Sequence, residues 1–316
     1  MGRSCASVQN FFRKIDQFPA QRANLAALDS LARVANIRSA SLRAAFPTKI
    51  PVVVHVLHTG GTDNIPDEQV ASQIDVLNED YNVKNSDLEN VPAPFKGLIG
   101  NPGIEFFLAN TDPTGAQTSG ITRTQTTVTA FGVDDSMKSD ASGGKSPWDI
   151  SRYLNIWVCA LSGGVLGYAQ FPGGDPTTDG VVVATTVFGR GSEFNLIPQF
   201  NLGRTATHEV GHYLNLFHIW GNEILPSCTD SDSVSDTPNQ FGPNTDKPTF
   251  PSPSCGNTQH GDMFMNYMDY VDDDTMVMFS KEQVARMHAA LEFSRSGLGT
   301  FAAVSAVAAP AGVRAG

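Results

Sequence analysis

The residues best suited to chemistry lie between His208 and His218. His208 and His212 are four positions apart, so on a helix their imidazole rings share one face and can bind one metal ion. Glu209 follows the first histidine and can act as a general base toward a water molecule at that metal. This H-E-x-x-H spacing predicts a catalytic zinc site in a hydrolase.

His218 can join this site only if the helix ends soon after His212. Ten residues of continuous helix would carry His218 about 15 Å along the axis from His208, too far to reach the same ion. We expect the turn at Asn215, because asparagine adopts the left-handed conformation readily. Three neutral imidazoles and one water would form an open tetrahedral zinc site, which is the catalytic kind.

A simpler interpretation is that two histidines lie by chance on an amphipathic helix beside a solvated glutamate. His218 weakens that interpretation, because it extends the motif. Met268, in the turn-like segment 266–270, weakens it further. A methionine in a short turn downstream of a three-histidine site is part of the metzincin pattern.

The extended motif therefore resembles the metzincin zinc endopeptidases. Longer strings, at 153–159, 166–173 and 218–221, resemble the pappalysin family and its smaller secreted microbial branch, the ulilysin- and cytophagalysin-like enzymes. The resemblance runs from about residue 50 to about residue 298. One departure is Asn215, where metzincins usually have glycine.

The resemblance implies an α/β (α+β) metzincin-like zincin fold. Its twisted mixed five-stranded sheet would carry a backing helix and the active-site helix, and its C-terminal subdomain would be irregular. The implied function is a secreted zinc-dependent endopeptidase that hydrolyses internal peptide bonds of proteins and is made as a latent zymogen. The alternative is a catalytically silent, metal-stabilised binding protein. Glu209 argues against it, because only catalysis requires that carboxylate.

The resemblance also implies roles for residues outside the histidine motif. Met268 would form an apolar floor beneath the zinc, and the Tyr270 hydroxyl would face the metal or the substrate oxyanion, unless Tyr270 is simply a core residue. The edge strand predicted at 164–170 would pair antiparallel with an extended substrate. The substrate-binding residues would be Gly167, Tyr168, Ala169 and Gln170.

The first 46 residues form a basic leader, with seven Lys/Arg and two acidic residues in a chain of net charge −11. This suggests a pro-segment that docks on its own enzyme, although a solvated basic helix would have the same composition. The string Arg3-Ser4-Cys5-Ala6 resembles the Arg-x-Cys-Gly leader of latent enzymes in this family. The Cys5 thiolate would be the fourth zinc ligand in the latent form, or else an unpaired cysteine. Cleavage is expected between residues 43 and 49.

The segment 221–262 is rich in polar residues and needs covalent or metal links to keep a defined shape. Cys228 and Cys255 offer a disulfide bond. Asp232, Asp236 and Thr237, with Asp230 nearby, offer hard oxygen ligands for calcium. Composition alone favours a solvated acidic loop, and the resemblance favours calcium. The resemblance and the cysteine pair together imply an extracellular protein, although no signal peptide is visible.

The rest of the sequence limits the alternatives. The 316 residues contain no apolar run of 18 or more and no basic stripe, so we expect no membrane span and no nucleic-acid partner. The expected partners are protein or peptide substrates and the chain's own pro-segment. We divide the chain into the pro-segment 1–46, a catalytic domain 47–298 with subdomains 47–218 and 219–298, and an Ala-rich tail 299–316, expected to be disordered.

The elements that would position the site follow from hydrophobic periodicity. Strands are predicted over 50–57, 104–109, 120–126, 153–159, 164–170 and 181–187. Helices are predicted over 8–45, 67–81, 201–217 and 280–293, the last with Ser280 as N-cap and Gln283 completing a capping box.

Overall fold

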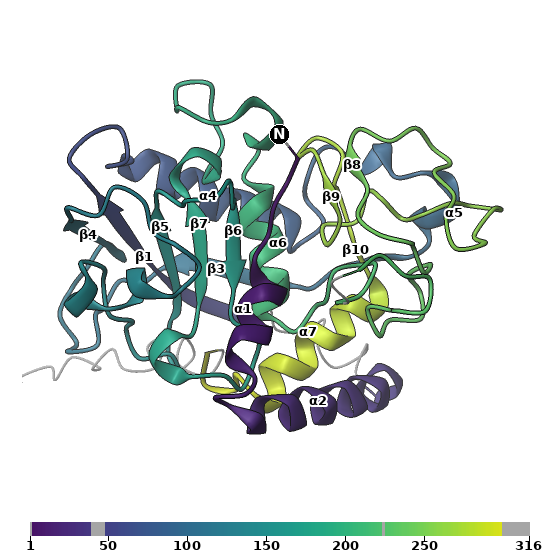
Figure 1. Ribbon diagram of the computed structural model, residues 1–316, viewed down its shortest axis with the longest axis horizontal. Coiled ribbons are helices and arrows are strands. Elements are labelled where there is room, and N and C mark those ends of the chain that lie inside the picture. The colour runs from purple at the N-terminus through teal and green to yellow at the C-terminus, as the bar shows by residue number, and fades with distance from the viewer. Residues whose placement is uncertain (1, 39–47, 223–224, 299–316) are drawn as a thin grey trace, which may run out of the picture.

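The computed structural model describes residues 2–38, 48–222 and 225–298 (Figure 1). The predicted tail 299–316 and most of the expected cleavage region lie outside these residues. No helix in the described part of the chain is both long and apolar enough to cross a membrane.

The centre of the molecule is a twisted mixed sheet with strand order β3-β1-β5-β7-β6, and β4 also pairs with β1. All pairings are parallel except that of β6 with β7. The strands are β1 (Thr48–His58), β3 (Ile104–Leu108), β4 (Ile121–Gln125), β5 (Leu154–Cys159), β6 (Gly167–Ala169) and β7 (Val181–Ala184). The sequence predictions placed all six, and β6 is an edge strand as expected.

The sheet has six strands where five were expected. The reason is the length of β1, which has 11 residues. Its first half, from Thr48 to Val52, pairs with β3, and its second half, from Val54 to His58, pairs with β4. Two short strands thus share one edge of β1, and the sheet remains five strands wide.

Two helices cover one face of this sheet. Alternate residues of β1, from Ile50 to Val56, lie in one apolar core with α4 (Asp67–Asp80) and α6 (Arg204–Tyr213). This alternation is the period of a strand with a buried face. Opposite-facing residues such as Leu57 and Trp157 belong to a second core, where loops cover the sheet. Helix α6 packs on α4, β6 and β7, so the histidine motif lies beside the edge strand.

The basic leader forms two helices, α1 (Ser7–Lys14) and α2 (Pro19–Arg38). A single helical region over 8–45 was predicted; the chain breaks before Pro19, which suits the first turn of a new helix because proline lacks an N–H. In Figure 1, α1 descends beside β6, and α2 lies across α7 (Lys281–Phe293). The predicted capping box of α7 is present, with both Ser280–Gln283 hydrogen bonds formed.

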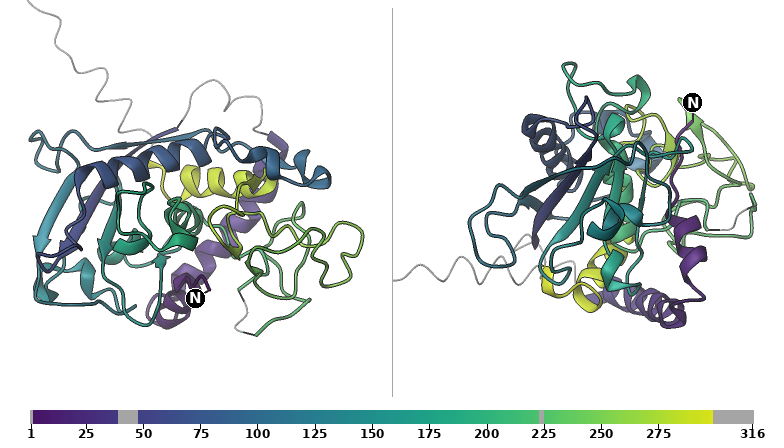
Figure 2. Two further views of the ribbon diagram at one scale, coloured as in Figure 1. Left: turned by 90° about the horizontal axis from the view of Figure 1, so that it is seen from above. Right: turned by 60° about the vertical axis from the view of Figure 1, so that its left-hand side comes forward.

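The C-terminal half is mostly irregular, as expected (Figure 2). Its short strands are β8 (Thr245–Asp246), β9 (Tyr270–Val271) and β10 (Phe279–Ser280), which pairs with β2 (Ile99–Gly100).

The other short elements lie earlier in the chain. Helix α5 spans Ala93–Lys96. The short 3-10 helices are Leu88–Asn90, Ser136–Lys138, Asp140–Ser142, Pro176–Thr178, Thr185–Val187 and Pro198–Phe200.

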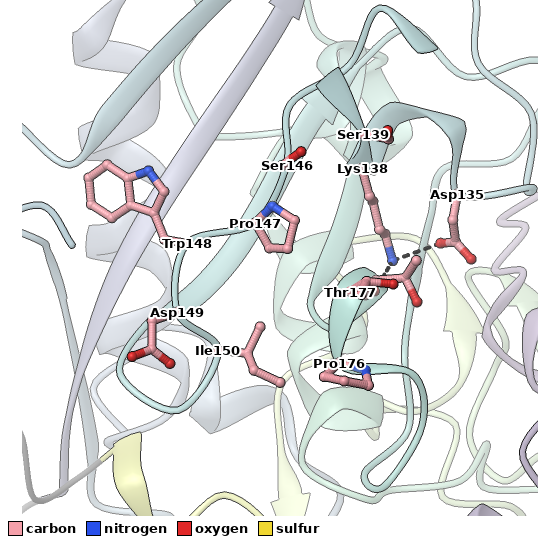
Figure 3. Close-up of a pocket in the computed structure, with 11 residues that line it drawn as sticks. Asp135, Lys138, Ser139, Ser146, Pro147, Trp148, Asp149, Ile150, Pro176 and Thr177 are labelled. Atoms are coloured by element: carbon pink, nitrogen blue, oxygen red, sulfur yellow. Dashed lines mark hydrogen bonds and ion pairs between the residues drawn. The ribbon is translucent and has the colours of Figure 1, made fainter. Parts of the chain in front are cut away.

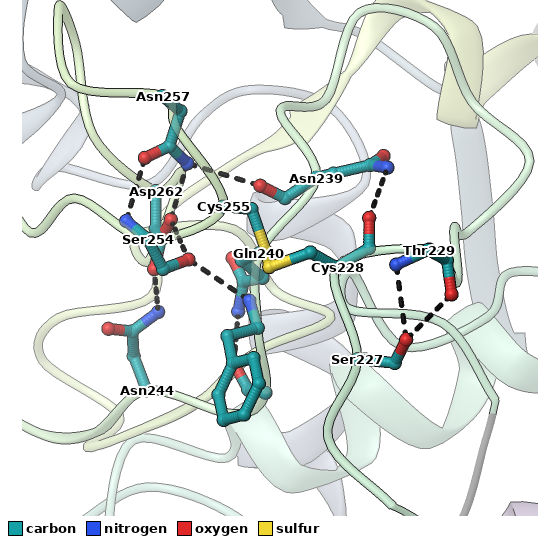
Figure 4. The surroundings of a disulfide bond; sticks show 12 residues. Ser227, Cys228, Thr229, Asn239, Gln240, Asn244, Ser254, Cys255, Asn257 and Asp262 are labelled. Carbon is teal, nitrogen blue, oxygen red and sulfur yellow. Dashed lines mark hydrogen bonds between the residues drawn. A yellow bond between two sulfur atoms is a disulfide. The ribbon is translucent and has the colours of Figure 1, made fainter.

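The predicted disulfide bond between Cys228 and Cys255 is present (Figure 4). It closes a loop of irregular chain, where backbone hydrogen bonds of a sheet or helix cannot fix the shape. Around it, the Asp262 carboxylate accepts hydrogen bonds from Ser254 Oγ at 2.7 Å and Asn257 Nδ2 at 2.5 Å. The bond and this network together hold the polar segment that follows the histidine motif.

Candidate active site

Four buried side chains converge at the C-terminal end of α6. They are His208, His212, His218 and Cys5, whose ligand atoms all lie within 4.8 Å of one another. His212 Nε2 lies 3.1 Å from His208 Nε2 and 3.2 Å from His218 Nε2. This is the only group of three or more potential metal ligands that the described residues bring together.

The hydrogen bonds of the rings indicate a metal site. His208 Nδ1 lies 2.7 Å from the Tyr267 carbonyl oxygen, and His212 Nδ1 lies 2.7 Å from that of Leu216. A carbonyl oxygen only accepts, so we assign the ring protons to Nδ1. The Nε2 atoms then face one another with lone pairs, an arrangement that is repulsive unless a cation lies between them. Three buried nitrogen atoms with free lone pairs fit zinc.

Burial also keeps these imidazoles neutral, as metal ligands must be. It lowers the pKa of His212 to about 4. The pKa values of His208 and His218 are lowered further, first by burial and then by the neighbouring histidines. At neutral pH all three rings therefore offer a lone pair.

The chain turns at Asn215, as predicted. Helix α6 ends at Tyr213, and Asn215 has a φ of 74°, in the left-handed region. The Leu216 amide then donates to the Gly211 carbonyl at 2.9 Å, which closes the turn and returns His218 toward the helix. Arg286 of α7 donates to the Asn215 carbonyl through Nε (3.2 Å) and Nη2 (3.1 Å), so the closing helix also fixes this turn.

We predict that Asn215→Gly is more stable than the native chain by about 1 kcal/mol. The buried Asn215 amide has no hydrogen-bond partner for Nδ2 or Oδ1 among the described residues, and glycine adopts positive φ without strain. Asn215→Ala should be less stable than Asn215→Gly by about 1 kcal/mol, because alanine is strained at this φ. Urea unfolding of the three proteins measures both differences. A glycine variant that loses stability or zinc would contradict this reading of the turn.

Met268 packs against α6 between the two zinc-motif histidines of that helix, at Gly211. A side chain at Gly211 would approach Met268 Sδ to 2.6 Å, so the thioether packs against the bare backbone of α6. The same segment orients a candidate ligand, because Tyr267 supplies the carbonyl that holds His208. The role of Met268 as an apolar floor stays a prediction, and the sequence gave no sign of the contact between Tyr267 and His208.

Glu209 points from α6 toward the edge strand. A side chain at Gly167 would come within 2.9 Å of Glu209 Cγ, so glycine at this position leaves space for the carboxylate. Glu209 Oε2 accepts a hydrogen bond from Ser7 Oγ at 2.9 Å and lies 3.3 Å from Cys5 Sγ. Burial raises the pKa of Glu209 to about 7 in this form. A carboxylate in this position can act as a general base toward a water molecule beside the histidines.

Tyr270 lies at the rim of the cluster and not in the core. Its hydroxyl accepts from the Cys5 amide at 3.2 Å and donates to the Cys5 carbonyl at 3.1 Å. The Trp220 ring is stacked on His218 at a centroid distance of 4.4 Å. The sequence did not indicate this stacking, because only the folded turn brings the two rings together.

The edge strand is occupied by the leader. The Ala6 amide donates to the Gly167 carbonyl at 3.0 Å, and the Leu166 amide donates to the Ser4 carbonyl at 2.9 Å. Cys5 pairs with Gly167 in parallel. The Ala169 amide donates to Ser7 Oγ at 2.8 Å.

The four predicted substrate-binding residues differ in what they present to the leader. Gly167 and Ala169 offer their backbone, as the preceding hydrogen bonds show. The Tyr168 side chain is buried in the second core. Gln170 accepts a hydrogen bond from Lys14 Nζ at 3.1 Å.

Three features of the site were missed by the sequence analysis. Arg3 is buried and donates to Asp273 at 2.5 Å and to Thr205 Oγ1 at 2.9 Å. Ser7 reaches the glutamate, and Asp135 holds the far end of α1. Arg3 was named there only as part of the Arg-x-Cys string, and its contacts with Asp273 and Thr205 were not predicted.

The residues predicted to bind calcium are neighbours with different hydrogen-bond partners. The Thr237 hydroxyl lies 2.9 Å from each oxygen of Asp232. Asp236 instead accepts from Ser280 Oγ at 2.6 Å and the Glu282 amide at 3.0 Å, at the start of α7. Burial raises the pKa of Asp232 to about 7. Calcium stays a prediction.

Comparison with known proteins supports the metalloprotease interpretation. The family model Peptidase_M43, described as pregnancy-associated plasma protein-A, matches residues 138–292. An extracellular metalloprotease of Arthroderma otae is 33% identical over 259 residues, covering 78% of this chain and 79% of that protein. Another, from Arthroderma benhamiae, is 33% identical over 86% of both chains.

Two solved structures resemble this structure closely. A promirolysin mutant of Tannerella forsythia has a TM-score of 0.86 and 42% identity over 96% of this chain and 99% of that one. Mature Tannerella forsythia mirolysin, in complex with a cleaved peptide, has a TM-score of 0.79 and 46% identity over 82% of this chain and 98% of that one.

Proposed function

Because this chain belongs to the pappalysin family of extracellular zinc metalloendopeptidases, we propose that His208, His212 and His218 hold its catalytic zinc. Glu209 is the general base, and residues 1–46 are the pro-segment of the zymogen. The observation that carries this proposal is the convergence of three neutral imidazoles on one point, with a buried carboxylate beside them.

The chemistry divides between the metal and the chain. Bound zinc lowers the pKa of a water molecule and polarises the scissile carbonyl. Glu209 accepts the proton of the attacking water and passes it to the leaving amine. The Tyr270 hydroxyl donates to the developing oxyanion. The backbone of Gly167 and Ala169 at the edge of β6 holds the extended peptide in place.

In the latent form the pro-segment blocks each of these groups. Cys5 Sγ lies among the three Nε2 atoms, where it would be the fourth ligand. Ser7 bonds Glu209, and Tyr270 bonds the backbone of Cys5. The leader also fills the peptide-binding edge, in the parallel direction that a substrate would not adopt.

Removal of zinc tests the proposed function. After activation of the full chain, 1,10-phenanthroline in the presence of excess calcium should abolish casein hydrolysis, and added zinc should restore it. The control is the same dose of a non-chelating phenanthroline isomer. Zinc that stays bound to a protein that cleaves no peptide would instead support the silent binding protein.

Calcium at Asp232, Asp236 and Thr237 is a further proposal about the same domain. A cation would stabilise the buried Asp232 carboxylate in its ionised form. We expect EGTA to lower the melting temperature by several degrees, with Asp232→Asn reproducing the loss in the presence of calcium. Elemental analysis that finds no calcium, together with an unchanged melting temperature, would contradict this proposal.

A further inference from the structure

Asp135 forms a cation site at the far end of α1 from the histidine cluster. Its side chain is only 4% exposed. Oδ1 lies 2.8 Å from Lys138 Nζ and accepts from the Tyr168 hydroxyl at 3.1 Å. Oδ2 lies 2.5 Å from Lys14 Nζ and 2.8 Å from Arg13 Nη2. The carboxylate therefore serves two sets of partners.

These two sets differ in origin. The partners of Oδ1, Lys138 and Tyr168, belong to the catalytic domain, while both cations at Oδ2 belong to the leader. Lys14 Nζ also lies 3.1 Å from Gln170 Oε1 and 2.7 Å from Thr178 Oγ1. When the leader departs, Lys138 still holds the carboxylate in place, and three oxygen atoms remain where the ammonium group was.

The site lies within reach of a bound peptide. Gln170 directly follows β6, and Ser7 at the start of α1 bonds Ala169 of that strand. Lys14 is seven residues along the helix from Ser7, or about 10 Å. An extended peptide covers this distance in about three residues.

The direction of the peptide follows from the direction of β6. This strand runs from Gly167, beside Glu209, toward Gln170. A substrate peptide paired antiparallel to β6 runs in the opposite direction. The peptide residues beside Gln170 therefore come earlier in the peptide than those beside Glu209. The cation site therefore faces the amino-terminal side of the bond to be cleaved.

We propose that in the activated enzyme Asp135, Gln170 and Thr178 bind a lysine or arginine side chain of the substrate, three to five residues before the cleaved bond. The inference rests on the proposed function, because it requires the leader to be removed. In the latent form, Lys14 of the leader occupies the position that this substrate side chain would take.

A cavity of about 530 Å³ adjoins the site. In Figure 3 it extends from Asp135 and Lys138 across to Trp148, with Pro147, Ile150 and Pro176 around it. It gives the longer arginine side chain, or the next residue of the peptide, an apolar surface to pack on. A substrate segment with a basic residue next to an apolar one fits this region best.

Peptide kinetics test the proposal. The full chain, once activated, is assayed on a peptide series in which lysine, norleucine or glutamate occupies each of the six positions before the cleaved bond. We expect lysine to raise kcat/KM about 10-fold over norleucine at one position from three to five, as a partly buried charge-assisted hydrogen bond would. Glutamate at that position should be the poorest substrate.

Asp135→Asn should reduce this preference to less than about 2-fold. Asparagine suits the left-handed conformation of Asp135, whose φ is 65°, and its amide oxygen can still accept from Lys138. Asp134→Asn is the matched control and should keep the full preference. Thr178→Val, which leaves Asp135 intact, should lower the preference to about 3-fold and serves as the second variant if Asp135→Asn does not fold.

Equal rates for lysine and norleucine at all six positions would overturn the inference while leaving the protease intact. An unchanged preference in both Asp135→Asn and Thr178→Val would also overturn it. If no peptide or protein is cleaved by the activated chain, the proposed function itself is wrong.

Discussion

Replacing Glu209 with glutamine is expected to lower kcat for peptide hydrolysis by about 10³-fold or more while leaving the zinc content unchanged. Glutamine keeps the size of the side chain and, in the latent form, can still accept the hydrogen bond from Ser7, but it cannot accept a proton from water. The three histidines do not contact the lost negative charge through hydrogen bonds, so their arrangement should persist.

The comparison requires that the variant be freed from its pro-segment by another protease, because it should not process itself. Glu105→Gln is the matched control, since Glu105 is a partly exposed carboxylate paired with Lys49 on the far edge of the sheet. It should keep native kcat. Native activity in Glu209→Gln, after contaminating proteases are excluded, would remove Glu209 from the mechanism.

Cys5→Ala is expected to speed the loss of the pro-segment at neutral pH by about tenfold or more. A thiolate is a strong zinc ligand, and its removal leaves the fourth position for water. Latency should not vanish completely, because Ser7 still bonds Glu209 and Arg3 still pairs with Asp273. Adding Ser7→Ala to Cys5→Ala should increase the rate further.

The matched control is a substitution at Cys159, the other free buried cysteine. Cys159 lies in β5, and Cys159→Ala should leave the rate of processing unchanged. Intact mass spectrometry over time measures the loss of the pro-segment in the native chain and in the three variants. If Cys5→Ala stays as latent as the native chain, latency depends on the contacts of Arg3 and Ser7, and Cys5 is not the switch.

The sequence predicted what depends on local spacing. The positions of His208, His212 and His218 imply a turn near Asn215 whatever the surrounding fold, because a continuous helix cannot bring the third ring to the same ion. The capping box at Ser280 is likewise a matter of residues three apart. The strands followed from their apolar pattern, and the pairing of Cys228 with Cys255 was the only choice within the irregular segment.

The sequence could not predict contacts between residues far apart along the chain. Arg3 and Asp273 are separated by 270 positions, and Asp135 meets Lys14 only because α1 descends beside β6. The pairing of both β3 and β4 with the same edge of β1 depends on how much longer β1 is than these two strands. Asp236 was considered only as a calcium ligand, and its position at the start of α7 depends on how the irregular segment folds back.

Intact mass and zinc content of the full chain, before and after incubation with calcium at neutral pH, test the central claim most directly. We expect one zinc ion for each chain throughout and the loss of a fragment close to residues 1–46. The loss should be absent with a zinc chelator and in Glu209→Gln. A chain that binds no zinc, or one that stays inactive on peptides after its pro-segment has been removed, would contradict the account.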